Sequence, residues 1–326
     1  MKTKHINKIK GNITIYSKSK AGNILDGSYR AIYKGRSQNF DELREYNLGD
    51  NVRDIDWKAS ARSNSVLVKQ YIAEKKHNVL FIIDNKLSMN AHAKDKKTLK
   101  KDLLLDTAGT IAYLAYKNGD YTGCIYTLND EIKYFPFKQN MYNIEYYLTS
   151  YEENLNKINN NSSEETGLNK SLDYILNNVN KSMIIFILTD LSGLEGMDNE
   201  LVKSLSYRND IMIINVEDAN LYDDNSYDFD QNKYFSALFL KNKKLLEIEN
   251  QEKKQIYDNC FNEYLKYRIT LTSIGDKDEI IPVIIELLER HRYAISNWIT
   301  RTIYLFFFIG DYINNNHHFM HCCFSI

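Results

Sequence analysis

The sequence predicts an α/β fold in which helices cover both faces of a largely parallel central sheet. Two apolar runs, Val79–Ile83 and Met183–Thr189, are each followed directly by an aspartate. Continuous apolar runs of this length are typical of strands that are buried on both faces. Helical and strand patterns then alternate from residue 76 to residue 292, which is the order expected of strand–helix–strand units.

The periodic segments give the expected elements in chain order. Strands are predicted where apolar residues run or alternate, over residues 66–71, 78–84, 122–128, 132–137, 183–189, 211–216 and 267–273. Helices are predicted where apolar residues recur every three or four positions, over residues 97–117, 143–155, 166–179, 198–207, 251–265 and 280–291. The turn Asn129-Asp130 joins two strands, and residues 237–248 are predicted to form a second hairpin.

The composition is that of an ordered globular protein. Hydrophobic residues make up 43% of the 326 positions, which is enough for a substantial core. The 42 basic and 43 acidic residues leave a net charge of −1, so there is no overall attraction to nucleic acid or anionic lipid.

The cysteines and the N-terminus predict a cytoplasmic protein. The four cysteines do not show the spacing of a secreted disulfide framework, which favours a reducing compartment. No apolar segment follows the basic N-terminus, so no signal peptide is expected. The apolar run Ile303–Ile309 is too short to cross a bilayer, which takes about 20 residues, but it leaves peripheral membrane association open.

Residues 1–26 are predicted to be a polar arm, and residues 27–75 a charged cap region ahead of the domain at 76–292. One interpretation of the cap is a solvated loop whose surface ion pairs contribute little. The other, favoured by the aromatic anchors, is an ordered cap in which arginine forks pair with fixed carboxylates. The candidate interaction residues of this cap are Arg44, Asp50, Arg53, Asp56, Trp57 and Arg62.

Residues 293–326 form a C-terminal extension that is expected to be poorly ordered. Three histidines and two cysteines lie within residues 317–323, and these are residue types that ligate zinc. Their spacing matches no standard zinc pattern, so a weakly packed terminal segment is the default expectation.

Oxygen-bearing side chains are expected to meet at one edge of the sheet. Asp84 and Asp190 each follow a strand, Ser88 lies close after the first, and Thr166 begins the helix before the second. Such a set of oxygens suits Mg²⁺ or Mn²⁺, and ligands bind at the carboxyl ends of parallel strands. The alternative is that Ser88 and Thr166 cap helices while the aspartates cap loops.

The core resembles the von Willebrand factor A domain, whose metal-ion-dependent adhesion site follows Asp-x-Ser-x-Ser with a later threonine and a later aspartate. Asp84 and Ser88 match the first and last motif positions, and Thr166 and Asp190 match the later ones. Lys86 stands where the family has the middle serine. An ammonium group at that position either fills the place of the cation or repels it.

The N-terminal block resembles the bacterial family named domain of unknown function 58. The matching segments are GRSQNFDELREY at 35–46, GDNVRDIDWKASAR at 49–62 and VKQY at 68–71. The resemblance covers approximately residues 25–292. It implies an adaptor or chaperone-like protein without established catalysis, often encoded beside a MoxR-type AAA+ ATPase, which is the partner expected here.

The leading functional hypothesis is therefore a non-catalytic interaction module that acts with such an ATPase in the assembly or maturation of other proteins. The alternative is a metal-dependent hydrolase using Asp84 and Asp190. The sequence contains neither a P-loop nor a Gly-x-Ser-x-Gly elbow, which weakens that alternative. Nucleic-acid binding by the N-terminal block is disfavoured because its acids equal its bases in density.

Overall fold

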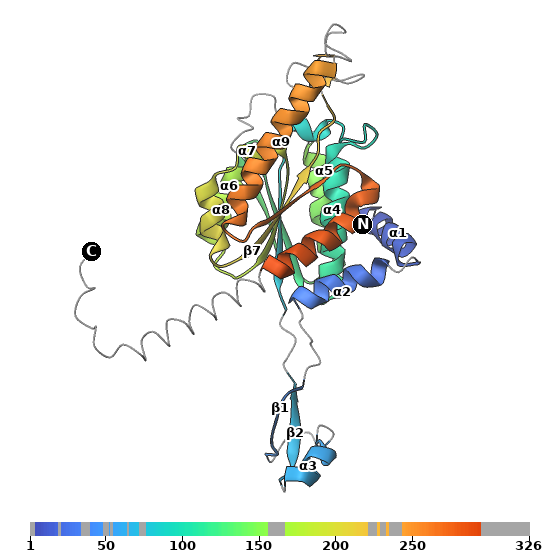
Figure 1. Ribbon diagram of the computed structural model, residues 1–326, viewed down its shortest axis with the longest axis vertical. Coiled ribbons are helices and arrows are strands. Elements are labelled where there is room, and N and C mark those ends of the chain that lie inside the picture. Colours follow the sequence, from blue (N-terminus) through green and yellow to red (C-terminus); the bar gives the residue numbers. More distant parts are fainter. Residues whose placement is uncertain are drawn as a thin grey trace, which may run out of the picture.

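The α/β fold is confirmed, with a six-stranded and mostly parallel sheet between two helical layers (Figure 1). The strand order is β10-β7-β6-β3-β4-β5, and only the β4–β5 pair is antiparallel. The computed structural model describes residues 4–18, 21–33, 40–47, 52, 55–63, 65–71, 76–155, 167–220, 227–228, 233–234 and 243–294.

The strands of this sheet are β3 (Asn78–Ile83), β4 (Tyr121–Leu128), β5 (Glu131–Lys138), β6 (Ile184–Asp190), β7 (Asp210–Val216) and β10 (Thr270–Ile274). The helices around it are α4 (Lys100–Lys117), α5 (Met141–Leu155), α6 (Gly167–Asn178), α7 (Leu191–Glu195), α8 (Asn199–Ser206), α9 (Lys243–Leu265) and one over residues 280–294. Two residues with positive φ, Asn129 and Asp130, make the tight turn of the β4–β5 hairpin.

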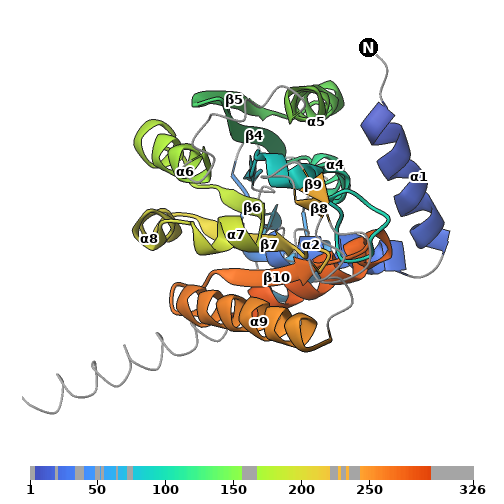
Figure 2. The same ribbon diagram turned by 90° about the horizontal axis from the view of Figure 1, so that it is seen from above.

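The apolar run of β3 serves two cores at once. Val79, Phe81 and Ile83 pack with α4, α5 and the helix over 280–294 on one face of the sheet. Leu80 and Ile82 pack with α6, α7 and α8 on the other face. Side chains alternate along a strand, so an uninterrupted apolar run is what a strand covered on both faces requires. Figure 2 shows the helices on the two sides of the sheet.

The N-terminal segment is helical where the sequence predicted a polar arm over residues 1–26. Helices α1 (Lys4–Lys18) and α2 (Ala21–Tyr33) lie against the body of the domain, and α2 crosses the proposed boundary at residue 26. Ile6, Ile9, Leu25 and Tyr29 are buried in the same core as α4 and α5. In α1 the apolar residues are few and stand among mainly polar ones, so the helical periodicity of that segment gave a weak signal.

A buried carboxylate fixes the start of α1. Glu145, on α5, accepts hydrogen bonds from the backbone nitrogens of His5 at 3.0 Å and Ile6 at 2.9 Å. The first backbone N–H groups of a helix lack partners within the helix, and Glu145 supplies them. The first turn of α1 is therefore tied to α5 by hydrogen bonds as well as by apolar packing.

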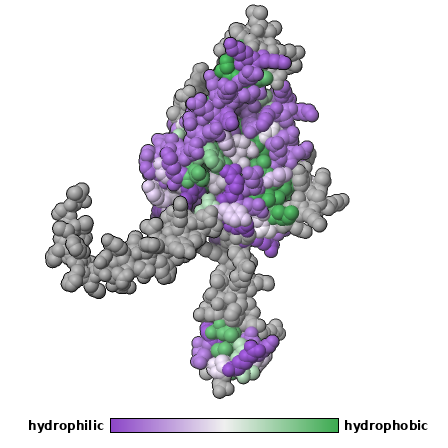
Figure 3. Space-filling view, in the orientation of Figure 1, coloured by the Kyte–Doolittle hydropathy of each residue, from purple (hydrophilic) through white to green (hydrophobic). Residues whose placement is uncertain are grey.

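The region predicted as a charged cap contains a small unit inserted between α2 and β3. Strands β1 (Phe40–Glu45) and β2 (Leu67–Tyr71) pair antiparallel, and α3 (Trp57–Ser63) packs beside β2. Val52, Trp57 and Val66 are exposed hydrophobic residues of this unit, where Figure 3 shows apolar surface beside hydrophilic surface.

One buried residue joins the two ends of this insertion to the domain. The carboxylate of Asp120, just before β4, accepts a hydrogen bond from the Tyr29 hydroxyl at 2.7 Å and from the His77 backbone nitrogen at 2.9 Å. Tyr29 belongs to the helix that precedes the insertion, and His77 follows it. Asp120 thus holds the chain on both sides of the small unit.

The predicted hairpin over residues 237–248 is wrong in the part that the structure describes, because residues from Lys243 onward belong to the long helix α9. Apolar residues on both sides of the polar segment 241–244 imitated the two strands and the turn of a hairpin. Residues 237–242 lie outside the described residues, as do residues 295–326 with the histidines and cysteines of the C-terminal extension.

A two-stranded sheet of β8 (Tyr227–Asp228) and β9 (Lys233–Tyr234) precedes α9. None of the described helices combines the length and apolarity needed to cross a membrane.

Candidate functional site

The site is built at the carboxyl ends of the neighbouring strands β3 and β6. Asp190 is the last residue of β6, and Asp84 follows β3 directly. The two strands are parallel and paired, and the Asp84 backbone nitrogen donates to the Leu188 carbonyl at 2.9 Å. Both aspartate side chains are buried, with 4% of the Asp84 side chain and 2% of the Asp190 side chain exposed. The pairing of the strands therefore brings two buried carboxylates to one edge of the sheet.

The ammonium group of Lys86 lies between these two carboxylates. Its Nζ is 2.6 Å from Asp190 Oδ1 and 3.4 Å from Asp84 Oδ2. It also donates a hydrogen bond to Ser192 Oγ, at 2.5 Å, near the start of α7. The Lys86 side chain is 10% exposed, so the positive charge is largely enclosed by its partners.

A second lysine reaches Asp190 from the opposite side. Lys100, in the first turn of α4, places its Nζ 2.6 Å from Asp190 Oδ2 and also pairs with Asp218, which follows β7. Ser88, in a short 3₁₀ helix over Leu87–Asn90, donates to Asp190 Oδ2 at 3.0 Å. The Gly193 backbone nitrogen donates to Asp190 Oδ1 at 3.0 Å. Both oxygens of Asp190 therefore accept several hydrogen bonds.

Asp84 is also held by neutral groups. Thr189 donates its hydroxyl to Asp84 Oδ2 at 2.6 Å, and the Tyr151 hydroxyl donates to the Asp84 backbone oxygen at 2.7 Å. Gly193 packs closely here, since a Cβ atom at this position would lie 2.3 Å from Asp84 Oδ2 and 2.0 Å from Thr189 Oγ1. Only glycine allows the start of α7 to approach the carboxylate this closely.

The sequence matches the family described as "Protein of unknown function DUF58" over residues 42–229, which is more than half of the chain. The chain belongs to the DUF58 family. The match begins in the small β1–α3–β2 unit and extends through β7, so it includes every residue of the site described above.

Curated relatives of this DUF58 chain carry the description "uncharacterized protein". Proteins of Mycobacterium bovis and of Mycobacterium tuberculosis strain H37Rv are each 28% identical to it over 108 residues. That segment is 33% of this chain and 33% of each relative, so the chain aligns with about a third of the length of the curated relatives it matches.

Two solved structures are distantly similar to the DUF58 chain. One is a conserved hypothetical protein, BatB, from Bacteroides thetaiotaomicron, at 12% identity and a TM-score of 0.41, covering 66% of this chain and 98% of that one. The other is an aerotolerance-related membrane protein from Bacteroides fragilis, at 13% identity and a TM-score of 0.41, covering 66% and 99%.

The charged groups of this DUF58 site shift one another's pKa values. Burial would raise the pKa of Asp190, but the ammonium groups of Lys100 and Lys86 outweigh burial and hold that pKa well below its usual range. Burial would lower the pKa of Lys86, but Asp84 and Asp190 outweigh it and raise that pKa. Burial raises the pKa of Asp84 above its usual value, with Lys86 acting in the opposite direction. Lys86 is therefore a permanently charged ammonium at neutral pH.

The structure brings together four of the five residues that the sequence singled out at this edge, namely Asp84, Lys86, Ser88 and Asp190. Thr166 lies outside the described residues. Sequence reasoning missed the second cation and its partner, Lys100 and Asp218. A usable signal was present, because Asp218 lies two residues beyond the third apolar strand and Lys100 lies on the otherwise apolar side of its helix.

The candidate cap residues are dispersed over the small unit. Asp56 caps α3 by accepting from the backbone nitrogens of Lys58 and Ala59. Arg44 donates to the Glu45 carbonyl at 3.2 Å. Trp57 is 65% exposed and Arg62 is exposed. The remaining two candidates, Asp50 and Arg53, lie outside the described residues.

Proposed function

We propose that this DUF58 protein is a non-catalytic interaction module whose domain is of the von Willebrand factor A type. The support is the placement of Asp84, Ser88 and Asp190 at the carboxyl edge of neighbouring parallel strands, in the order of the adhesion motif. In this proposal, a partner protein binds at that edge, where Ser192 is exposed beside the Lys86 ammonium. The Ser192 hydroxyl is a polar group that this edge presents to the partner.

The observation that carries the proposal is the position of Lys86 Nζ between Asp84 and Asp190. In the related metal sites this space belongs to a divalent cation. Both oxygens of Asp190 accept hydrogen bonds from charged or polar donors, and a metal ion would meet the like charge of the ammonium. The residues present therefore do not fit Mg²⁺ or Mn²⁺ unless Lys86 moves away, and the lysine acts as a built-in cation.

The same geometry makes hydrolysis by Asp84 and Asp190 the less favoured function. Asp84 Oδ2 and both oxygens of Asp190 already accept hydrogen bonds or ion pairs from protein groups, which disfavours either carboxylate as the base that activates a water. The Ser192 hydroxyl lies 2.5 Å from Lys86 Nζ, a spacing also found in serine–lysine nucleophile pairs. That chemistry needs a neutral lysine, whereas the two aspartates raise the pKa of Lys86 and keep it protonated.

The partner class follows from the family resemblance. The adaptor role in assembly or maturation, and a MoxR-type AAA+ ATPase as partner, are what that resemblance implies for the chain. The test is affinity capture from the native cell under ATP-trapping conditions, with the wild type beside Lys86→Met. We expect an AAA+ ATPase with the wild type and less of it with the variant. Lys170→Met, which removes an exposed lysine paired with Asp130, is the control. Capture of no such ATPase would refute the partner assignment.

The built-in cation is tested by calorimetric titration of Mg²⁺ and Mn²⁺ into the wild type, Lys86→Ser and Lys170→Ser. Lys86→Ser restores the middle serine of the motif and removes the competing charge, so we expect saturable binding only in that variant. Tight binding by the wild type would show that the ion and the ammonium group coexist, and the proposal would then fail.

A further inference from the structure

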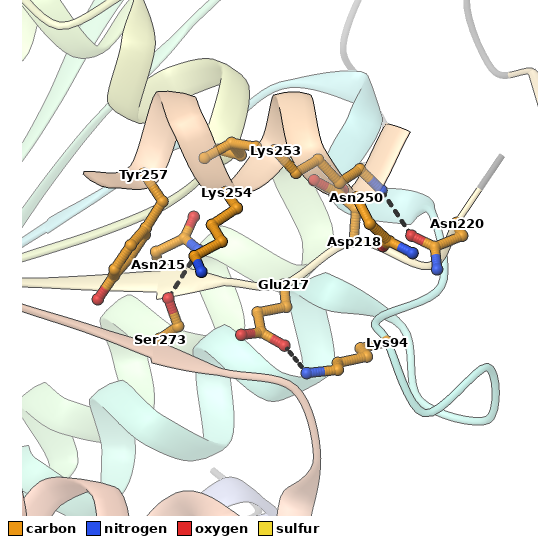
Figure 4. Close-up of a pocket in the computed structure, with 11 residues that line it drawn as sticks. Lys94, Asn215, Glu217, Asp218, Asn220, Asn250, Lys253, Lys254, Tyr257 and Ser273 are labelled. Carbon is orange, nitrogen blue, oxygen red and sulfur yellow. Dashed lines mark hydrogen bonds and ion pairs between the residues drawn. The ribbon is translucent and has the colours of Figure 1, made fainter. Parts of the chain in front are cut away.

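A second candidate site lies on the far side of β7 from β3. It is a pocket of about 470 Å³ between the carboxyl ends of β7 and β10 and the helix α9 (Figure 4). Asn215 of β7 and Ser273 of β10 form part of its wall, and Lys254 and Tyr257 line it from α9. Pockets of roughly 300–1,000 Å³ hold small ligands or short peptide segments.

The Asn215 side chain leaves one hydrogen-bonding atom unused. Its Nδ2 donates to Ser273 Oγ at 3.0 Å. Its Oδ1 is buried and has no hydrogen-bond partner within the part of the chain that the structure describes, although Asn215 is only 3% exposed. Figure 4 shows this amide beside Tyr257 and Lys254. Buried polar atoms are rarely left unpaired, so the pocket offers an acceptor for an incoming N–H group.

The charges around the pocket leave one ammonium without a carboxylate. Glu217 pairs with Lys94 at 2.5 Å, and Asp218 pairs with Lys100. Lys253 pairs with Glu249 at 2.7 Å. Lys254 also lines the pocket, and among the described residues it makes no ion pair. The lining acids are thus neutralised, and Lys254 supplies a positive charge for an anionic ligand.

We propose that this pocket binds the carboxylate end of a peptide. The terminal carboxylate pairs with Lys254, and the N–H of the last peptide unit donates to Asn215 Oδ1. The last residue of a peptide carries both groups, a carboxylate for Lys254 and an N–H for Asn215 Oδ1. The Tyr257 ring offers an apolar wall to the side chain of that residue. Capture of terminal carboxylates is a known mode of peptide recognition. Binding at this pocket does not require the partner or the built-in Lys86 cation proposed above.

The test uses the full chain and ligand-observed NMR with two probes, N-acetyl-trialanine with a free carboxylate and the same peptide with a C-terminal amide. We expect saturable binding of the acid and roughly tenfold weaker binding of the amide, the size typical of one charge-assisted hydrogen bond. Lys254→Gln is expected to abolish this preference. Lys266 lies just beyond α9 and pairs with Glu263, and Lys266→Gln is expected to retain the preference for the acid.

Asn215→Leu separates the two interactions. It keeps a side chain of similar size but offers no acceptor, so we expect weaker binding of both probes, again by about tenfold. Circular dichroism confirms folding of each variant, and Lys254→Gln, an exposed change, carries the test if Asn215→Leu does not fold. Equal binding of acid and amide, no saturable binding, or no effect of Lys254→Gln would overturn the proposal. So would acetate or inorganic phosphate binding as tightly as the peptide, which would indicate a general anion site.

Discussion

Replacement of Lys86 by methionine tests whether the ammonium group holds the site together. Met has a similar length and no charge. Among the described residues, Lys86→Met therefore leaves the buried Asp84 and Asp190 with Lys100 as the one cation in contact with either of them. The Lys86 contacts that are lost are the 2.6 Å and 3.4 Å ion pairs and the 2.5 Å hydrogen bond to Ser192. Removing one member of a buried ion pair costs about 3–5 kcal/mol. We therefore expect the free energy of unfolding to fall by this amount at pH 7.

Urea denaturation of the full chain, followed by circular dichroism, measures that loss. Lys170→Met removes an exposed ion pair with Asp130 and is expected to cost less than about 1 kcal/mol. The Lys86→Met loss should also shrink as the pH falls below neutral. The reason is that the raised pKa of Asp84 rises further without Lys86, so the carboxyl can take up a proton in the folded state. Equal losses for the two variants would refute the structural role of the ammonium.

Three further predictions concern single residues. Gly193→Ala places a methyl group against Thr189 and Asp84 and should cost about 1–3 kcal/mol, lowering the thermal midpoint, whereas Gly27→Ala, with open space around it in α2, should not lower it. Glu145→Gln turns one acceptor at the start of α1 into a donor and should cost about 1–3 kcal/mol in urea denaturation, with Glu153→Gln as the exposed control; an unchanged midpoint would contradict the capping role. The pKa of Asp190 is held low, so its stabilising effect is present above roughly pH 4, the unfolded pKa, and is lost as the pH falls through the lower folded value. The urea midpoint should therefore fall in acid, and less steeply in Asp190→Asn.

The domain core was predictable because its signals are local. An apolar run ending in a carboxylate identified β3 and β6, and the Asn129-Asp130 turn identified the hairpin of β4 and β5. Helices with a wide apolar stripe, such as α4, were found for the same reason. Where burial depends on only three or four residues in a polar segment, as in α1, periodicity is too weak to distinguish a docked helix from an arm.

The site was predictable in part. Strand pairing dictates that Asp84 and Asp190 meet, because the carboxyl ends of neighbouring parallel strands share an edge. The direction of a long flexible side chain is not dictated in this way. That Lys86 turns inward and that Lys100 reaches Asp190 from α4 depend on tertiary geometry, and a lysine in the sequence is by default a solvated surface residue.

The arrangement at Asp120 has a consequence for how this protein family can diversify. The buried Asp120 carboxylate accepts one hydrogen bond from the Tyr29 hydroxyl, before the small β1–α3–β2 unit, and one from the His77 backbone nitrogen, after it. The inserted unit is therefore fastened at its base by a residue that belongs to the body. Sequence changes confined to the unit leave both hydrogen bonds to Asp120 intact, so they need not disturb the start of β3. The surface of the insertion can therefore change in sequence while the charged cluster at the carboxyl edge of the sheet stays as it is.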